Sequence, residues 1–133
     1  MTKILVAEDE RDIRELIAFT LSSLGGFEII KANNGEEAVE KAREEIPDLI
    51  LLDVRMPKMT GYEACSQLKA DPLTQNIPIV FLSAKGQEAE IQQGLELGAE
   101  EYILKPFDPG ELVEKIRAIL RRVQARRAEQ VQV

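Results

Sequence analysis

Residues 48–57 read Asp48-Leu49-Ile50-Leu51-Leu52-Asp53-Val54-Arg55-Met56-Pro57, so that four apolar residues lead directly into an acid and a proline follows soon after. A short apolar run bounded by turn residues is typical of a strand buried on both faces, as in the middle of a parallel sheet covered by helices. Asp53 would then stand at the carboxyl end of that strand. Ligands bind at this edge of open α/β sheets, so the other groups that reach it indicate the function.

Strand and helix patterns alternate along the rest of the chain. Short apolar runs predict four further strands, at residues 3–7, 27–30, 78–82 and 101–104. Apolar residues at helical spacing predict helices after each strand, the last three at residues 62–70, 86–97 and 109–120. The first helix carries Ile13, Leu16, Ile17, Thr20, Leu21 and Leu24 at this spacing.

Helix caps and glycines support these boundaries. Asn34 is placed to cap the second helix, and Asp108 is placed to cap the last helix with Pro109 at its first position. Gly94 falls in the middle of the helix at residues 86–97 and weakens it by propensity.

Five alternating strands and helices predict an α/β fold with helices on both faces of a parallel sheet. The expected strand order is 2-1-3-4-5, a common doubly wound arrangement whose switch point lies between the first and third strands. We expect one domain over residues 1–122, followed by residues 123–133 as a basic tail or the start of a linker helix.

The composition is that of an ordinary globular domain and excludes several kinds of site. The chain has 133 residues, 44% of them hydrophobic, which suffices for one buried core. It contains no histidine, which excludes histidine ligands and bases, and its single cysteine, Cys65, cannot form an internal disulfide. No apolar run approaches the roughly 20 residues that span a bilayer. With no secretory signal in view, we expect a cytoplasmic protein without membrane contact.

Charge is unevenly distributed. The net charge is −7, yet Arg121, Arg122, Arg126 and Arg127 crowd the end of the chain. The acidic body argues against direct nucleic-acid binding. The basic end fits a solvated helix terminus, where cations are favourable, although a nucleic-acid or membrane patch is the alternative interpretation.

Polar groups follow four of the predicted strands at the same edge of the sheet. Clustered carboxylates repel one another unless a cation lies among them, and oxygen ligands without histidine or cysteine favour Mg²⁺. A lysine could hold phosphate oxygens, and a hydroxyl beside the backbone amide of Ala84 could donate to them. The acid in the centre could then be the nucleophile that accepts a phosphoryl group. In strand order these groups are Glu8-Asp9, Asp53, Ser83 and Lys105.

Each of these residues alone has an ordinary structural explanation. Glu8, Asp9 or Ser83 could simply cap the following helix, and Lys105 could be a surface lysine. The joint arrangement is what indicates a phosphoryl site.

The set resembles the receiver domain of bacterial two-component response regulators, with the single-domain chemotaxis regulator nearest in size. The resemblance covers about residues 3–122 and implies a flavodoxin-like (βα)5 fold. Asp9 precedes Asp53 by 44 positions, and Ser83 and Lys105 follow Asp53 by 30 and 52 positions, spacings that fit the family. The motifs are Glu8-Asp9, Asp53 with Met56-Pro57 and Gly61, Ser83-Ala84, Tyr102, and Lys105-Pro106-Phe107.

The resemblance implies roles at the acceptor. Asp53 would receive the phosphoryl group, and Lys105 would pair with it. Asp9, Asp53 and the backbone carbonyl of Arg55 would bind Mg²⁺ directly, while Glu8 would act on the metal through water.

The resemblance also implies a switch. Ser83 would move onto the phosphate, and Tyr102 would swing into the space opened by that movement. Half-buried packing at a strand edge is the ordinary explanation for Tyr102. A cis bond would precede Pro106.

By the same resemblance, the protein is a signalling phosphoacceptor rather than an enzyme, although it assists its own phosphotransfer and dephosphorylation. Its donor would be a sensor histidine kinase or a phosphotransfer protein. The changed surface would comprise the fourth helix, the fifth strand and the last helix, and it would control a downstream protein or an output domain missing from this chain. A phosphorylation-dependent dimer is a further possibility.

Two basic residues bear on the lifetime of the phosphoryl group. Arg55 lies two residues after Asp53, and Lys85 lies two residues after Ser83. They could screen the phosphoryl group from water, or they could be ordinary solvated surface cations.

Three other functions fit less well. A receiver-like module without phosphorylation would be expected to have lost one of the key residues, and none is missing. An aspartate-based phosphohydrolase commonly has a second acid where Arg55 stands. A carrier of FMN would need more aromatic residues and a phosphate-cradling loop after the first strand.

Overall fold

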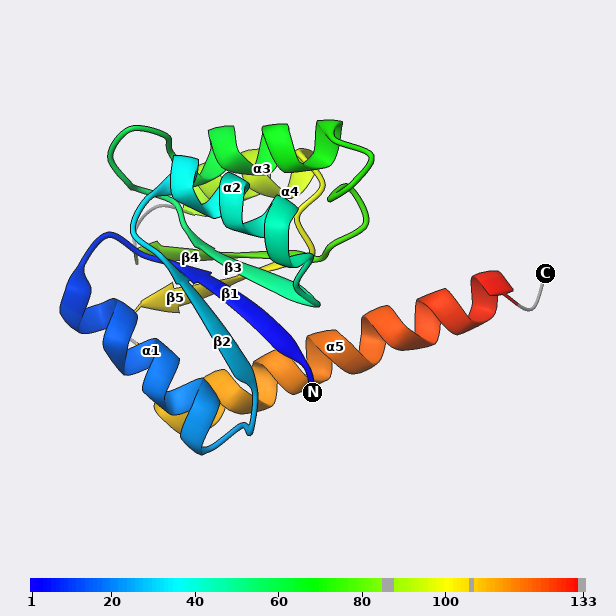
Figure 1. Ribbon diagram of the computed structural model, residues 1–133, viewed down its shortest axis with the longest axis horizontal. Helices are drawn as coiled ribbons and strands as arrows, with labels where there is room; N and C mark the ends of the chain where they lie inside the picture. Colours follow the sequence, from blue (N-terminus) through cyan, green and yellow to red (C-terminus); the bar gives the residue numbers. More distant parts are fainter. Residues whose placement is uncertain (85–87, 106, 132–133) are drawn as a thin grey trace.

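The computed structural model describes residues 1–84, 88–105 and 107–131, which form an alternating series of strands and helices (Figure 1). No helix within these ranges is both long and apolar enough to cross a membrane. The strands are β1 (Lys3–Ala7), β2 (Glu28–Ala32), β3 (Leu49–Asp53), β4 (Ile79–Ala84) and β5 (Glu101–Lys105). The helices are α1 (Arg11–Ser23), α2 (Gly35–Glu45), α3 (Gly61–Ala70), α4 (Glu88–Glu96) and α5 (Pro109–Val131).

The five strands form one parallel sheet in the order β2-β1-β3-β4-β5, which confirms the predicted topology. β3 lies in the centre, and all five of its residues are buried. The register pairs Ala7 with Leu52 and Asp53 with Leu82, so the ends of β1, β3 and β4 come to one edge of the sheet.

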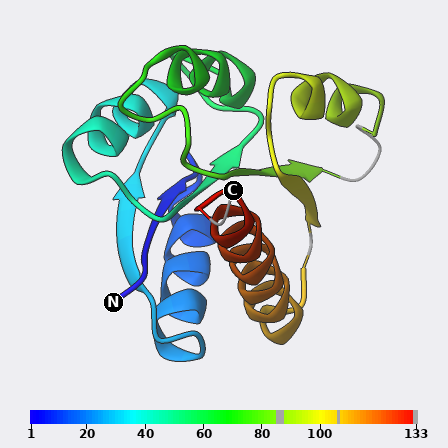
Figure 2. The same ribbon diagram turned by 90° about the vertical axis from the view of Figure 1, so that its right-hand side faces the viewer.

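Two helical layers bury the two faces of the sheet (Figure 2). One face packs against α2, α3 and α4, where small side chains such as Ala38, Ala64 and Cys65 let the helices approach closely. The other face packs against α1 and α5 through larger side chains, including Leu21 and Ile116. Cys65 is fully buried, and burial raises the pKa of its thiol to about 11, so it acts as a packing residue.

Side-chain caps begin three of the helices. Asn34 Oδ1 accepts a hydrogen bond of 2.8 Å from the Glu37 amide, and Asp108 Oδ1 accepts one of 3.1 Å from the Glu111 amide. Both predicted caps are therefore confirmed. Thr60 and Glu63 form a reciprocal capping box at the start of α3, which satisfies two backbone donors.

The residues that predicted the first helix by their spacing differ in burial. Ile17, Thr20 and Leu21 are buried, but Leu16 and the C-cap residue Leu24 are largely exposed. The apolar residues of α1 extend over a wider part of the helix surface than the sheet and α5 cover. Helical periodicity alone therefore could not separate the buried apolar residues from the exposed ones.

Gly94 has a packing role that helix propensity could not reveal. A Cβ atom at this position would lie 2.6 Å from Phe81 Cε2 and 2.9 Å from Tyr62 Cε1. The rings of Phe81 and Tyr62 pack edge to face with centroids 5.1 Å apart. Gly94 therefore lets α4 lie directly on this aromatic pair.

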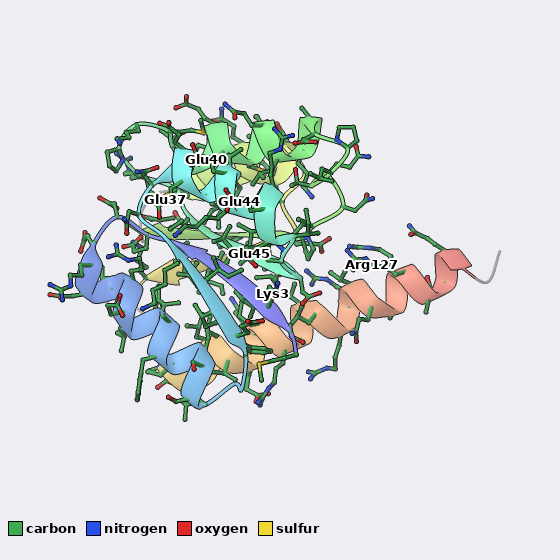
Figure 3. The ribbon with its side chains drawn as sticks, in the orientation of Figure 1. Lys3, Glu37, Glu40, Glu44, Glu45 and Arg127 are labelled. Carbon is green, nitrogen blue, oxygen red and sulfur yellow. The ribbon has the colours of Figure 1, made fainter. Side chains whose placement is uncertain are left out.

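Acidic side chains gather along α2, whereas the far end of α5 is basic (Figure 3). Figure 3 shows Glu37, Glu40 and Glu44 along α2, and Arg127 on the last turns of α5. At the end of α2, Lys3 Nζ lies 3.1 Å from Glu45 Oε2. The acidic and basic residues that are unevenly distributed in the sequence thus lie on different parts of the folded protein.

Ile46 ends α2 in a left-handed conformation, with φ 44° and ψ 65°. This region is strained for a β-branched residue and open to glycine. We expect Ile46→Gly to raise the free energy of unfolding by about 1 kcal/mol in urea titrations. The control Glu44→Gly changes an exposed helical residue and should lower it by about 1 kcal/mol. A lower stability for Ile46→Gly would contradict the prediction.

Candidate functional site

The predicted acidic and basic groups do meet at the carboxyl edge of the sheet. Glu8 directly follows β1, Asp53 ends β3, Ser83 lies in β4 and Lys105 ends β5. Glu8, Asp53 and Ser83 are buried, with relative exposures of 0%, 6% and 1%. Because the apolar strands place these groups inside the protein, their charges and hydrogen bonds must be satisfied locally.

Lys105 joins the two buried acids. Its Nζ lies 3.2 Å from Glu8 Oε1 and 3.2 Å from Asp53 Oδ1. Burial lowers the pKa of Lys105, but the charges and hydrogen bonds of Asp53 and Glu8 outweigh it and leave the pKa above its usual value. The ammonium therefore stays protonated at the centre of the site.

Asp9 completes a cluster of three acids. One carboxylate oxygen from each of Glu8, Asp9 and Asp53 lies within 4.8 Å of the others, which is a spacing that a metal ion could bridge. Asp9 is exposed, so the cluster opens to solvent on one side. Among the described residues, the buried Glu8 Oε2 finds no hydrogen-bond partner. Oxygen donors without histidine or cysteine, together with this unmatched oxygen, fit a hard divalent cation.

The cluster holds one carboxyl in an unusual state. The pKa of Glu8 rises from 4.5 to about 8, mainly because the residue is buried and also because Asp53 lies beside it, while Lys105 opposes the shift. One positive charge thus does not fully balance the buried acids. A bound cation would supply the missing charge.

Glu8 makes stability depend on pH when metal is absent. The folded protein retains the Glu8 proton up to about pH 8, whereas the unfolded chain releases it near pH 4.5, so stability falls as pH rises between these values. In EDTA, we expect the free energy of unfolding to fall by at most about 1.4 kcal/mol per pH unit. Glu8→Gln should flatten this dependence, and Glu40→Gln on the exposed face of α2 should keep it. Equal slopes in wild type and Glu8→Gln would contradict the assignment.

The loop after β3 is held tightly against the ends of β3 and β4. The Val54 amide donates to the Leu82 carbonyl at 3.0 Å, and the Gly61 amide donates to the Val54 carbonyl at 2.9 Å. A Cβ atom on Gly61 would lie 2.3 Å from the Asp53 carbonyl oxygen. From the sequence, Gly61 was identified only as part of a motif. The structure shows why glycine is needed at this position: two backbone segments approach each other too closely for a side chain.

The remaining predicted residues lie around this centre. Tyr102 is half-buried in β5 and packs against the core shared with α2 and α3. The Ser83 hydroxyl is 3.4 Å from the Ala84 carbonyl oxygen. Arg55 is exposed beyond the end of β3. The predictions for Lys85 and Pro106 lie outside the described residues.

The family match and two similar curated proteins point to the same protein family. The response regulator receiver domain family matches residues 4–117. The phosphate regulon transcriptional regulatory protein PhoB of Escherichia coli K12 is 43% identical over 129 residues, which cover 97% of this chain and 56% of that protein. The probable transcriptional regulator ycf27 of Guillardia theta is 43% identical over 120 residues, which cover 90% of this chain and 46% of that protein. The chain thus spans about half the length of these relatives.

The fold is also shared with solved structures. Chemotaxis protein CheY4 of Vibrio cholerae superimposes with a TM-score of 0.84 at 32% identity, covering 90% of this chain and 98% of that one. The order of the strands and helices in this chain is therefore that of a known fold.

Proposed function

Since this chain belongs to the response regulator receiver domain family, we propose that Asp53 is its phosphoacceptor and that Lys105 and the acidic cluster serve the transfer. The observation that carries the proposal is the pair of 3.2 Å contacts from Lys105 Nζ to Asp53 and Glu8. A buried carboxylate beside a fixed cation, at the edge of a rigid sheet, is prepared to attack an electrophilic phosphorus.

In the proposed reaction, a carboxylate oxygen of Asp53 forms a bond to phosphorus while the bond to the donor breaks, and the donor leaves with that electron pair. Lys105 can then move from the carboxylates to the phosphoryl oxygens, whose charge it stabilises. Glu8, Asp9, Asp53 and the backbone carbonyl of Arg55 would hold Mg²⁺, with Glu8 acting through water. Bound Mg²⁺ would neutralise the charge of the acids and the phosphoryl group.

The same charge would drive a switch between two arrangements. The phosphoryl oxygens need donors, which the Ser83 hydroxyl and the Ala84 amide can supply once β4 and its loop adjust. Tyr102 would then move further into the protein, and the surface made by α4, β5 and α5 would change. Signalling, rather than metabolic turnover, follows from family membership, while assistance to phosphotransfer and to dephosphorylation is part of the proposal.

Tyr102 provides a test of the switch that is separate from the chemistry. We expect Tyr102→Ala to keep Mg²⁺-dependent phosphorylation within about twofold of wild type, because the side chain lies outside the Lys105 contacts. The surface change on phosphorylation, measured by amide hydrogen exchange of β5 and α5, should be lost. Phe27→Ala, at a partly buried aromatic beside the opposite face, is the control and should keep that change. Failure of phosphorylation itself in Tyr102→Ala would overturn the switch assignment.

The decisive experiment for the proposal is intact mass after incubation with acetyl phosphate, with either Mg²⁺ or EDTA. We expect a gain of one phosphoryl group with Mg²⁺ that EDTA suppresses. Steady release of phosphate without any covalent species would indicate a phosphohydrolase, and binding of FMN would indicate a carrier. No gain under any condition would leave only a receiver-like interaction module.

We further propose a phosphoryl donor, a cellular location and an output for this domain. The donor would be a sensor histidine kinase or phosphotransfer protein in the cytoplasm. The domain itself would contact neither nucleic acid nor membrane. PhoB and ycf27 are transcriptional regulators and extend well beyond the matched region, so an output domain after this receiver is the favoured arrangement, with a phosphorylation-dependent dimer as a further step. The receiver would comprise residues 1–122, and α5, which continues to Val131, would begin the linker.

A further inference from the structure

α5 packs on the receiver as far as Val123 and keeps polar contacts to it as far as Arg127. Val123 is only 4% exposed and belongs to the core between α1, α5 and the sheet. Figure 1 shows α5 as one continuous helix whose last turns project beyond the sheet. Among residues 124–130, no apolar side chain belongs to the buried core, and the contacts of this part of α5 with the rest of the protein are polar ones made by Arg126 and Arg127.

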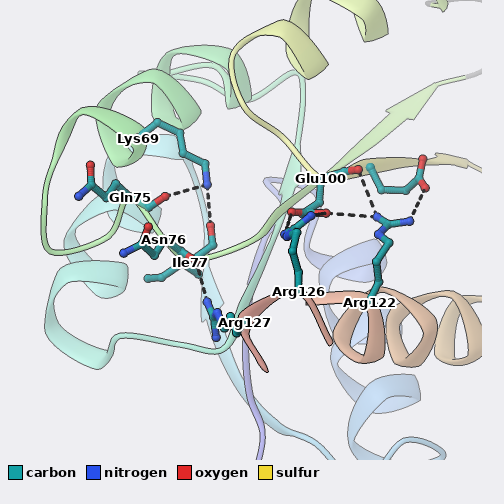
Figure 4. Close-up of polar contacts among 9 residues, drawn as sticks. Lys69, Gln75, Asn76, Ile77, Glu100, Arg122, Arg126 and Arg127 are labelled. Atoms are coloured by element: carbon teal, nitrogen blue, oxygen red, sulfur yellow. Dashed lines mark hydrogen bonds and ion pairs between the residues drawn. The ribbon is translucent and has the colours of Figure 1, made fainter. Parts of the chain in front are cut away.

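Two arginines of α5 converge on Glu100, which directly precedes β5 (Figure 4). Arg126 donates to both carboxylate oxygens of Glu100, and Arg122 Nη2 lies 3.3 Å from Oε2 and 3.3 Å from the Glu100 carbonyl oxygen. We call Glu100, Arg122 and Arg126 the Glu100 clamp. The Glu100 side chain is 15% exposed, whereas the side chains of Arg122 and Arg126 are 48% and 50% exposed, so the carboxylate is shielded from solvent and the two arginines are only partly shielded.

A second contact fastens the next residue of the helix. Arg127 Nη2 donates to the Asn76 carbonyl oxygen at 2.7 Å. That loop is itself fixed, because Lys69 Nζ donates to the carbonyl oxygens of Gln75 and Ile77 at 3.0 and 2.9 Å (Figure 4). The loop before β4 and the start of β5 therefore both hold the end of α5.

β5 links this clamp to the proposed acceptor site. Glu100 donates its amide to the Ile79 carbonyl at 2.8 Å and directly precedes β5. Lys105 ends the same strand and contacts Asp53 at 3.2 Å. Five residues of extended strand span about 16 Å, so one rigid element joins the two sites.

We propose that the Glu100 clamp couples β5 to the end of α5 and thereby relays the state of Asp53 to the chain that follows the receiver. This relay rests on the proposed phosphorylation of Asp53. When Lys105 turns to the phosphoryl group and Tyr102 moves, β5 shifts against α5. The clamp is formed in the arrangement in which Lys105 Nζ contacts Asp53 and Glu8, so a shift of β5 away from that arrangement lengthens the clamp contacts and loosens residues 124–130. The following segment then changes its orientation relative to the receiver.

The electrostatics of Glu100 agree with this role. Burial raises the pKa of Glu100, but the hydrogen bonds and charges of Arg126 and Arg122 outweigh it and leave the pKa below its usual value. The carboxylate therefore remains charged at neutral pH, and a loss of the clamp would require movement rather than protonation.

The first arm of the test asks whether the clamp orders α5. Amide hydrogen exchange of residues 124–130 is measured in wild type, Glu100→Gln, Arg126→Gln and the double variant. We expect about fivefold faster exchange in Glu100→Gln and a smaller increase in Arg126→Gln, which leaves the pair between Arg122 and Glu100 in place. The double variant should exchange no faster than Glu100→Gln, because that change already removes the ion pairs with both arginines. Glu114→Gln, which breaks an exposed pair with Arg117 within α5, is the matched control and should leave exchange unchanged. Equal exchange in wild type and both single variants would overturn the clamp.

The second arm asks whether phosphorylation reaches the clamp. With excess acetyl phosphate and Mg²⁺, exchange of residues 124–130 should rise about threefold in wild type and not rise further in Glu100→Gln. Intact mass measured in parallel shows whether Asp53 is occupied. A phosphoryl gain without any change at residues 124–130 would refute the relay and leave the proposed function standing. If no phosphoryl group is gained, the proposed function fails and the relay loses its input, whereas the first arm still reports on the clamp.

Discussion

Asp53→Asn is expected to abolish the gain of a phosphoryl group from acetyl phosphate in the presence of Mg²⁺. Asparagine keeps the size of the side chain, but its amide lacks the carboxylate charge that makes Asp53 nucleophilic. Glu8 also lies 3.2 Å from Lys105 Nζ, but it follows β1 rather than the central strand and is more deeply buried than Asp53. Intact mass should therefore show only unmodified protein.

Folding of Asp53→Asn can be checked separately. The variant removes one charge from a cluster in which neighbouring acids repel, so its thermal midpoint should not fall below that of wild type in EDTA. Asp12→Asn, at an exposed position in the first turn of α1, is the matched control and should be phosphorylated normally. Retention of the phosphoryl gain in Asp53→Asn would move the acceptor to another residue and refute the assignment.

Gly61→Ala is expected to lower the free energy of unfolding by about 3 kcal/mol, an overpacking effect at the upper end of the usual range. The new methyl group would lie 2.3 Å from the Asp53 carbonyl oxygen and 3.0 Å from Val54 Cα, which are backbone atoms that no rotamer change can move. Relief requires a shift of the loop or of the end of β3. Phosphorylation should therefore also slow, because Asp53 would leave its position beside Lys105.

Gly110→Ala is the control for this effect. A Cβ atom at Gly110 would meet only the side chain of Asp108, at 3.2 Å, and alanine is the better helix former. Its stability in urea should equal or slightly exceed that of wild type. If Gly61→Ala unfolded at the same urea concentration as wild type, the backbone contact would not be the reason for glycine at this position.

Local patterns in the sequence were sufficient to predict the elements and their order. Apolar runs mark the buried strands β1, β3 and β4. The caps at Asn34 and Asp108 accept hydrogen bonds from backbone amides only three residues away. Both kinds of signal therefore lie within a few residues of the structure that they predict. The polar residues that follow those runs also identified one edge of the sheet. This was enough to predict that Glu8, Asp9, Asp53 and Lys105 would meet, because parallel strands all end on that edge.

Only the tertiary structure decided which of these groups touch and what else the packing requires. Lys105 contacts Glu8, which is 97 positions away in the sequence, and Arg126 contacts Glu100, which is 26 positions away. The periodicity of the sequence cannot predict contacts between residues so far apart. The exposure of Leu16 and the need for glycine at positions 61 and 94 likewise depend on neighbours contributed by other elements. The physical reason is that periodicity reports which face of an element is buried, whereas contacts depend on how closely and at what angle the elements pack.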